Sequence, residues 1–95
     1  MLFIAYCVDK KDHLQVRLDT RPAHIAFLET KGDGLKLGGP TTEADGETPN
    51  GSLLIFEESY LQAAKEWISK EHYAAAGLFE SGEVKPWKRG LGVGL

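Results

Sequence analysis

Apolar residues form two continuous runs of strand length along this chain. The first run covers residues 2–8 (LFIAYCV) and the second covers residues 52–56 (SLLIF). Runs without polar alternation are typical of central strands that are covered on both faces. Residues 35–39 predict a further strand, and the mixed polar and apolar stretch 77–87 predicts a fourth. Pro86 places the last strand at a sheet edge or at a contact between subunits, because proline cannot donate to the ladder.

The segment between the first two predicted strands has helical character, but it contains a proline. Asp12 is a suitable cap for a short helical turn. Pro22 lacks an N–H group and would clash with the carbonyl four residues earlier, so we do not expect one unbroken helix from Asp12. A restart near Asp19-Thr20 is predicted instead, because proline is tolerated in a first turn. Lys31-Gly32 would end this helix.

A second helix is predicted to open at Ser59, since Ser59 and Gln62 have the spacing of a capping box. The element order is therefore β-α-β-β-α-β, which is the ferredoxin-like α+β arrangement, with a four-stranded antiparallel sheet and two helices on one face. The other face of so apolar a sheet would be exposed in a monomer. We therefore expect a homodimer with its sheets packed face to face.

Composition and charge exclude several classes of partner. The 95 residues fit one domain, with 26% charged residues and a net charge of −3. No basic stripe is present for nucleic acid, and no basic amphipathic helix for a membrane surface. The apolar start of the chain lacks the positive region of a signal peptide and is too short to span a bilayer. The single cysteine, Cys7, is expected to be a buried thiol, and the predicted location is the cytoplasm.

Other motifs give no support for a metal or an organic cofactor. The glycine cluster at 32–38 leads from a helix into a strand, which reverses the order of a dinucleotide fingerprint. The cluster at 90–94 has no helix after it. The histidines His13, His24 and His72 lack the spacing of metal ligands. We therefore expect neither a metal nor a cofactor.

His24 is the main candidate for chemistry. It is either a satisfied core residue or a group that transfers protons, because histidine is the side chain whose charge changes near neutral pH. Near the start of the expected helix, the helix dipole would favour its neutral, basic form. Arg17 and Arg21 either bind an acidic substrate or are solvated charges. Ser52 either donates a hydrogen bond to a ligand or only begins a strand.

Five short segments, in the same order, resemble the YCII-related family. They are RPAH at 21–24, LGGP at 37–40, GS at 51–52, YAAAGLFE at 73–80 and VKPWK at 84–88. We expect residues 1–88 to form the domain and 89–95 a glycine-rich tail. The resemblance implies a dimeric α+β barrel with a histidine–aspartate pair in a pocket. One branch of the family resembles lyases that dehydrochlorinate hydroxyquinols, and the wider fold group includes muconolactone isomerases and monooxygenases.

The resemblance also implies which residues form the site. His24 falls on the family histidine, and Glu71 falls on the family aspartate, which keeps the charge but reaches one methylene further. His72 stands where proline is usual and adds a second imidazole. Tyr73, on the residues alone, is a packed aromatic. The implied substrate-binding residues are Arg21, Pro40, Ser52, His72 and Tyr73.

The sequence therefore predicts a small acid–base enzyme of the lyase or isomerase type. His24 and Glu71 would be catalytic, and the substrate would be a small organic acid or phenol. The alternative is a dimeric, non-catalytic module that binds a small metabolite. A carboxylate within hydrogen-bond reach of His24, inside a pocket, favours the enzyme.

Overall fold

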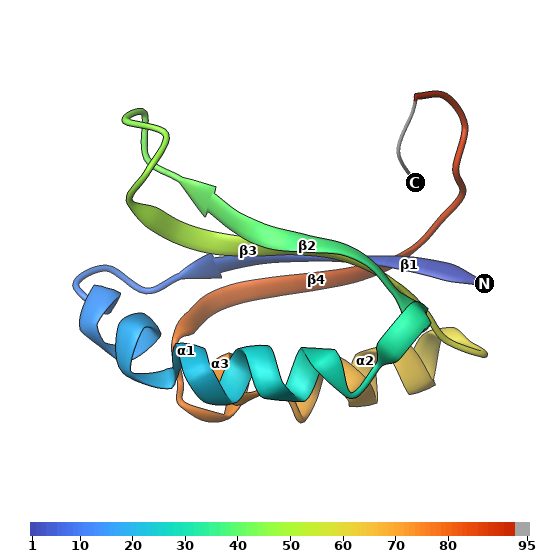
Figure 1. Cartoon of the computed structure of the whole chain (residues 1–95), viewed down its shortest axis with the longest axis horizontal. Helices are drawn as coiled ribbons and strands as arrows, with labels where there is room; N and C mark the ends of the chain where they lie inside the picture. Colours follow the sequence, from blue (N-terminus) through green and yellow to red (C-terminus); the bar gives the residue numbers. More distant parts are fainter. Residues whose placement is uncertain (93–95) are drawn as a thin grey trace.

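The computed structural model describes residues 1–92 and places four strands in one antiparallel sheet. The strands are β1 (Leu2–Asp9), β2 (Leu35–Thr42), β3 (Pro49–Glu57) and β4 (Phe79–Trp87), in the order β2-β3-β1-β4. The helices α1 (Leu14–Glu29), α2 (Leu61–Ser69) and α3 (His72–Ala75) lie on one face of the sheet (Figure 1), and a short 3-10 turn, Gly32–Gly34, leads into β2. The predicted ferredoxin-like α+β fold and the edge position of the last strand are confirmed.

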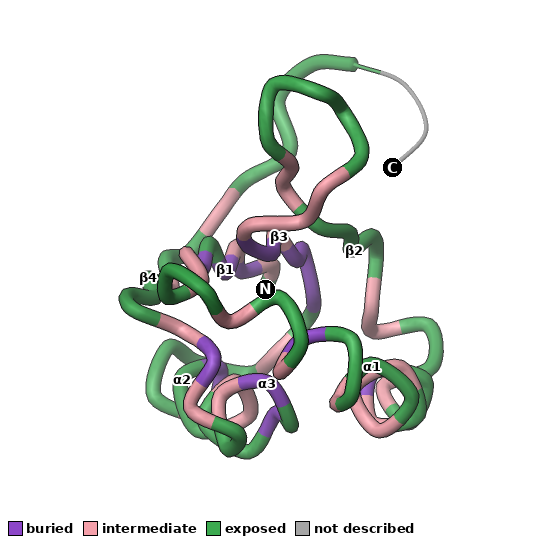
Figure 2. The backbone as a smooth tube through the Cα atoms, turned by 90° about the vertical axis from the view of Figure 1, so that its left-hand side faces the viewer, coloured by how far each residue is buried: buried purple, intermediate pink, exposed green. Residues whose placement is uncertain are grey.

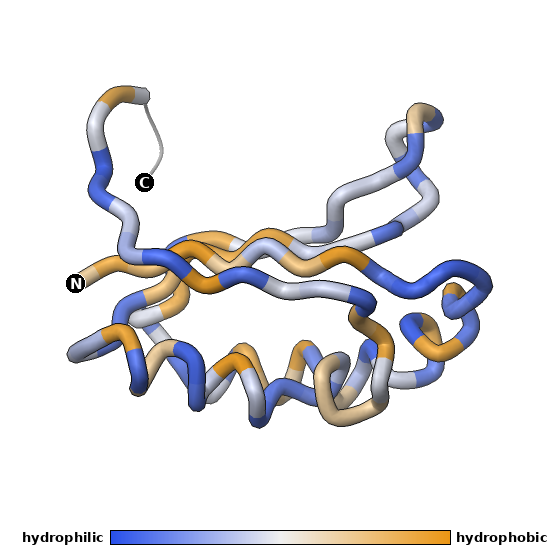
Figure 3. The backbone as a smooth tube through the Cα atoms, turned by 180° about the vertical axis from the view of Figure 1, so that it is seen from behind, coloured by the Kyte–Doolittle hydropathy of each residue, from blue (hydrophilic) through white to orange (hydrophobic). Residues whose placement is uncertain are grey.

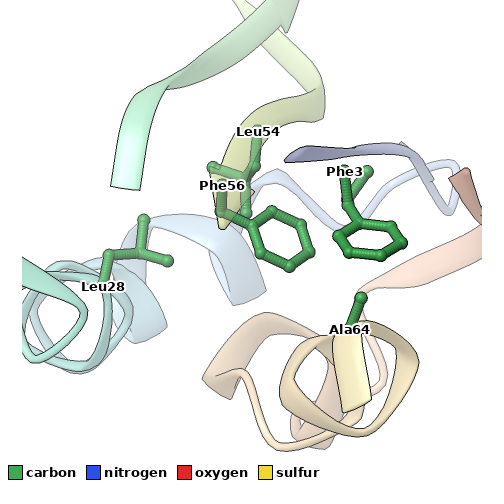
Figure 4. Close-up of a cluster of buried hydrophobic side chains, with 6 residues drawn as sticks. Phe3, Leu28, Leu54, Phe56 and Ala64 are labelled. Atoms are coloured by element: carbon green, nitrogen blue, oxygen red, sulfur yellow. The ribbon is translucent and has the colours of Figure 1, made fainter. Parts of the chain in front are cut away.

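The hydrophobic core lies between the sheet and the helices (Figure 2). Phe3 of β1 and Phe56 of β3 are cross-strand partners with no exposed surface, and their ring centroids are 6.2 Å apart. Leu28 of α1 and Ala64 of α2 cover these rings from the helical side (Figure 4). Burial of each phenylalanine stabilises the fold by roughly 1.5–3 kcal/mol. This cluster fixes α1 and α2 against the sheet.

The opposite face of the sheet is open in the single chain. Residues of β1 alternate between the two faces, so the neighbours of buried Phe3 and Ala5 point outward. Tyr6 is 47% exposed and Leu37 of β2 is 37% exposed. The strands of the sheet carry hydrophobic residues along much of their length (Figure 3). The expectation that the apolar strands are covered on both faces is therefore not met within one chain.

The helix α1 runs through Pro22 without a break, so the predicted restart near Asp19 is wrong. Pro22 lies on the exposed side of α1, where water can take the place of the lost backbone hydrogen bond. Arg17 and Leu28, at the two ends of the helix, are both buried. Their packing outweighs a local proline cost of roughly 3 kcal/mol.

The start of α2 also differs from the prediction. Its N-cap is Tyr60, and no side chain caps the helix, so the capping box of Ser59 and Gln62 is wrong. Packing of Trp67 on the ring of Phe56, at a centroid distance of 4.7 Å, holds α2 in place instead. Among the described residues, none of the helices combines the length and the apolar character that crossing a bilayer requires.

Candidate active site

A cavity of about 410 Å³ lies between α1 and the neighbouring strands β2 and β3. Its volume falls in the range of about 300–1,000 Å³ that is typical of small-molecule sites. The cavity brings together most of the residues that the sequence predicts for the site. The predicted residues that line it are Arg21, His24, Pro40, Ser52 and Tyr73.

His24 and Glu71 are hydrogen-bonded, although 47 residues separate them in sequence. Nδ1 of His24 contacts Oε1 of Glu71, and the two side chains are 12% and 2% exposed. A carboxylate can only accept hydrogen bonds, so the proton of the neutral imidazole lies on Nδ1. The other ring nitrogen, Nε2, keeps its lone pair for a group in the cavity.

The place of His24 in α1 corrects one expectation. The helix begins at Leu14, so His24 lies in its second half rather than near its start. The helix dipole acts mainly on the first and last turns. The predicted effect of the helix N-terminus on His24 is therefore wrong, and Glu71 is the group that sets its proton position.

Glu71 is held by a second hydrogen bond. It is the N-cap of the four-residue helix α3, and its Oε2 accepts the backbone N–H of Tyr73 at 2.9 Å. Each bond of this kind contributes roughly 0.5–1.5 kcal/mol. The ring of Tyr73 stacks on the imidazole of His24, with centroids 3.8 Å apart and planes at 16°. The orientation of both His24 and Glu71 is therefore fixed by α3.

Arg17 is buried beside the cavity and forms an ion pair that the sequence analysis missed. Its Nε donates to Oδ2 of Asp9 at 2.7 Å, and its Nη2 donates to Oδ1 of Asp9 at 2.9 Å. Nη2 also lies 2.8 Å from the carbonyl oxygen of Gly51 and 2.9 Å from Oγ of Ser52. Burial opposes the charge on Arg17, but the hydrogen bonds and charge of Asp9 outweigh it and raise the pKa of the guanidinium.

A signal for Arg17 is present in the sequence. Arg17, Arg21 and His24 are spaced at i, i+4 and i+7, which places them on one face of a helix. Asp9 directly follows the apolar residues of β1. Charged residues at such positions are usually solvated. The spacing alone therefore does not show that Arg17 is only 4% exposed.

Tyr73 connects Arg17 to His24. Its ring stacks on His24, and the guanidinium carbon of Arg17 lies 4.5 Å from the ring centroid. Burial raises the pKa of the Tyr73 phenol, against the lowering effect of the charge on Arg17. The phenol therefore keeps its proton at neutral pH and can donate a hydrogen bond.

The remaining predicted residues have different places. Arg21 and Pro40 are exposed where they line the cavity. His72 is exposed outside the cavity lining, and its ring contacts the edge of Phe27 at a centroid distance of 5.9 Å. Its position gives no support to the predicted contact with a substrate. Within residues 1–92, no three side chains of His, Cys, Asp or Glu are grouped so that they could hold a metal ion.

Solved structures are similar to this chain at two levels. The 5-chloro-2-hydroxyhydroquinone dehydrochlorinase TftG of Burkholderia phenoliruptrix AC1100, in complex with 2,5-dihydroxybenzoquinone, is 36% identical with a TM-score of 0.88, and the match covers 95% of this chain and 96% of TftG. An antibiotic biosynthesis monooxygenase has a TM-score of 0.59 at 14% identity, covering 96% of this chain and all of its own. The second similarity shows the fold alone.

Sequence relatives lead to the family. Protein YciI of Escherichia coli O6:H1 is 40% identical, over 94% of this chain and 98% of its own length. An uncharacterized protein of Haemophilus influenzae is 32% identical with the same coverage. Residues 1–88 match the YCII-related domain. The chain is therefore a member of the YCII-related family.

Proposed function

We propose that this protein is an acid–base lyase that removes HCl from a small chlorinated, hydroxylated ring. The observation that carries the proposal is the hydrogen bond from His24 to the buried Glu71 at the wall of a cavity. A positioned histidine of this kind contributes typically 10²–10⁴-fold to a rate. The dehydrochlorinase activity of TftG, at 36% identity, supports the choice of reaction.

The reaction needs only proton transfers and the departure of chloride. Nε2 of His24 takes a proton from a ring hydroxyl, and Glu71 stabilises the imidazolium that forms. The imidazolium returns the proton to the carbon that bears chlorine, which leaves a ketone in the ring. A second hydroxyl then gives its proton to Nε2, and the C–Cl bond breaks with its electron pair on chloride. The hydroquinone becomes a quinone, and no external oxidant takes part.

The proposed experiment measures chloride release from 5-chloro-2-hydroxyhydroquinone, under argon to prevent oxidation of the substrate. His24→Asn is expected to lower kcat by roughly 10²–10⁴-fold. The matched control is His13→Asn, because His13 bonds the carbonyl of Lys11 at 2.7 Å and does not line the cavity. The control should keep the rate of the wild type.

Two outcomes would reject the proposed reaction. In the first, His24→Asn releases chloride as fast as the wild type. In the second, the wild type binds 2,5-dihydroxybenzoquinone but neither releases chloride nor exchanges ring hydrogen with D₂O. The second outcome would support the alternative of a non-catalytic binding module.

We also propose that the open face of the sheet pairs with a second copy of the chain. On this face Ile4 opposes Ile55, and Tyr6 opposes Leu53, so apolar pairs lie side by side across β1 and β3. A self-complementary apolar face is the usual basis of a two-fold dimer. Sedimentation equilibrium should show a dimer, and Tyr6→Glu should shift it to a monomer. A monomeric wild type at micromolar concentration would contradict this.

A further inference from the structure

An extra residue in β3 directs part of the hairpin between β2 and β3 toward the cavity. Thr42 pairs with Pro49, whereas the residue before Thr42 pairs with Gly51, so Asn50 is an additional residue on β3. A β-bulge of this kind moves the side chains beyond it to the other face of the strand. Pro49 and Glu47 therefore line the cavity, on the same side of the sheet as the core.

The bulge is held by side chains of the hairpin itself. Oγ1 of Thr41 donates to Oδ1 of Asn50 at 2.8 Å, and Nδ2 of Asn50 donates to Oε2 of Glu43 at 2.8 Å. A Cβ atom at Gly51 would lie 2.5 Å from Oγ1 of Thr41 and would clash with the carbonyl oxygen of Cys7. Only glycine therefore fits beside the bulge, and the direction of the hairpin is set before a ligand binds.

The tip of the hairpin holds the backbone of Glu47 and leaves its carboxylate free. Oδ1 of Asp45 accepts the backbone N–H groups of Glu47 and Thr48, each at 2.9 Å. The hydroxyl of Thr48 and these two N–H groups lower the pKa of the Asp45 carboxyl. Within residues 1–92, no protein group is hydrogen-bonded or ion-paired to the carboxylate of Glu47. This carboxylate can therefore accept a hydrogen bond from a ligand.

The charges around the cavity give this carboxylate a consequence for the choice of ligand. Among the described residues that line the cavity, Glu47 is the one acidic side chain, and Arg21 is exposed on the opposite wall in α1. The charge of Arg17 is compensated by Asp9, and Glu71 lies behind the neutral imidazole. Three carboxylates therefore surround the cavity together with two guanidinium groups. Close to Glu47 an anion is repelled, and a neutral donor finds an acceptor.

We propose that Glu47 is a specificity-determining residue, which accepts a hydrogen bond from the ring edge facing the hairpin and repels a carboxylate at that edge. This inference rests on the proposed function and deepens it. The sequence leaves a small organic acid and a phenol open as substrates. Glu47 selects the phenol. Because Glu47 is exposed and partly screened by salt, its effect is severalfold rather than thousandfold.

The test measures calorimetric binding of two ring probes of the same shape, under argon. The first, 2,5-dihydroxybenzamide, is neutral and has N–H donors where the second, 2,5-dihydroxybenzoate, has a carboxylate. The measured quantity is the dissociation constant of the benzoate divided by that of the benzamide. A change in the shape of the cavity would weaken the binding of both probes, so this ratio reports the charge and the hydrogen bond at the ring edge.

The wild type should bind the benzamide more tightly than the benzoate. Glu47→Gln should lower the ratio roughly three- to tenfold, and Glu47→Lys should lower it further. The matched control is Glu43→Gln, which removes the same charge from the same hairpin but at a residue outside the cavity lining. Glutamine at position 43 can still accept from Asn50, so the bulge should persist and the ratio should equal that of the wild type.

Salt gives a second measurement on the same proteins. Raising the salt concentration from about 0.01 M to about 1 M shortens the Debye length from about 30 Å to about 3 Å. The difference between the ratios of the wild type and Glu47→Gln should therefore shrink.

Four results would overturn the inference. They are tighter binding of the benzoate by the wild type, an unchanged ratio in Glu47→Gln, an equal change in Glu43→Gln, and a wild type that binds neither probe at millimolar concentration. The proposed lyase fails differently. If the wild type releases chloride but the ratio does not depend on Glu47, the role of Glu47 is wrong and the lyase remains. If Glu47 sets the ratio but no chloride is released, the lyase is wrong and the selectivity remains.

Discussion

Replacement of Glu71 by glutamine should preserve the fold and reverse the tautomer of His24. Two N–H donors face the side chain of Glu71, namely Nδ1 of His24 and the backbone nitrogen of Tyr73. Glutamine offers only one acceptor oxygen, and its NH₂ group must meet the other donor. The backbone of Tyr73 cannot change, whereas an imidazole can move its proton. We therefore expect the glutamine NH₂ to donate to Nδ1, which places the proton of His24 on Nε2.

The size of the effect follows from these contacts. With its proton on Nε2, His24 can no longer act as the base in the cavity, so kcat should fall by about 10²–10⁴-fold. This corresponds to about 3–5 kcal/mol in the activation barrier. Both hydrogen bonds persist, so the free energy of unfolding should change by about 1 kcal/mol or less. Glu71→Ala, by contrast, leaves two buried N–H groups without an acceptor, so it should lower the free energy of unfolding by about 2–6 kcal/mol.

The assay combines three measurements on the wild type, Glu71→Gln and Glu71→Ala. The ¹⁵N shifts of His24 report the tautomer, chloride release reports kcat, and urea titration reports the free energy of unfolding. The reasoning is refuted if Glu71→Gln keeps the proton on Nδ1 and retains the wild-type rate. A Glu71→Gln variant with a lowered kcat but an unchanged tautomer would also contradict the reasoning, because the lost charge of Glu71 would then be the cause of the lower rate.

Three further predictions concern the surroundings of the site. Arg17→Met leaves the carboxylate of Asp9, only 7% exposed, without its partner, and should lower the free energy of unfolding by about 3–5 kcal/mol in a urea titration. A second substitution in the same chain, Asp9→Asn, should restore a large part of this loss. Burial raises the pKa of the Cys7 thiol from 9.0 to about 11. As pH rises from 9 to 11, the thiol of the unfolded chain therefore loses its proton before the thiol of the folded chain. In urea titrations over this pH range, the free energy of unfolding should fall by about 2–3 kcal/mol more for the wild type than for Cys7→Ala. Gly38→Ala would place a Cβ 2.6 Å from Cδ2 of Leu54 in the cavity wall, so calorimetry should show severalfold weaker binding of 2,5-dihydroxybenzoquinone, and equal affinity would contradict this.

The fold was predictable because apolar runs and turns determine the order of strands and helices. The runs at 2–8 and 52–56 became the two central strands, β1 and β3. The sequence failed where a local rule competes with packing. Pro22 predicts a helix boundary by its chemistry, but the burial of Arg17 and Leu28 on the same helix depends on the sheet beneath it. The spacing within the helical segment shows which residues share a face, but not which of them the sheet buries.

The site was predictable only in part, for a related reason. His24 and Glu71 are 47 residues apart, and only the packing of α1 against α3 brings them into contact. No spacing rule connects them, so the family resemblance was the sole sequence signal for this pair. The ion pair of Arg17 and Asp9 was missed because charged residues at a strand end and on a helix are usually solvated.

The two carboxylate oxygens of Glu71 accept hydrogen bonds from different elements of the site. One carboxylate oxygen caps α3 through Tyr73, and the other accepts from His24. The same Tyr73 stacks on the imidazole and lies under Arg17. The short helix α3 therefore orients the proposed base and its carboxylate partner, and it also contacts the guanidinium of Arg17. Since one carboxylate serves both the cap and the imidazole, a change that disturbs α3 should alter the chemistry of His24 before it alters the sheet.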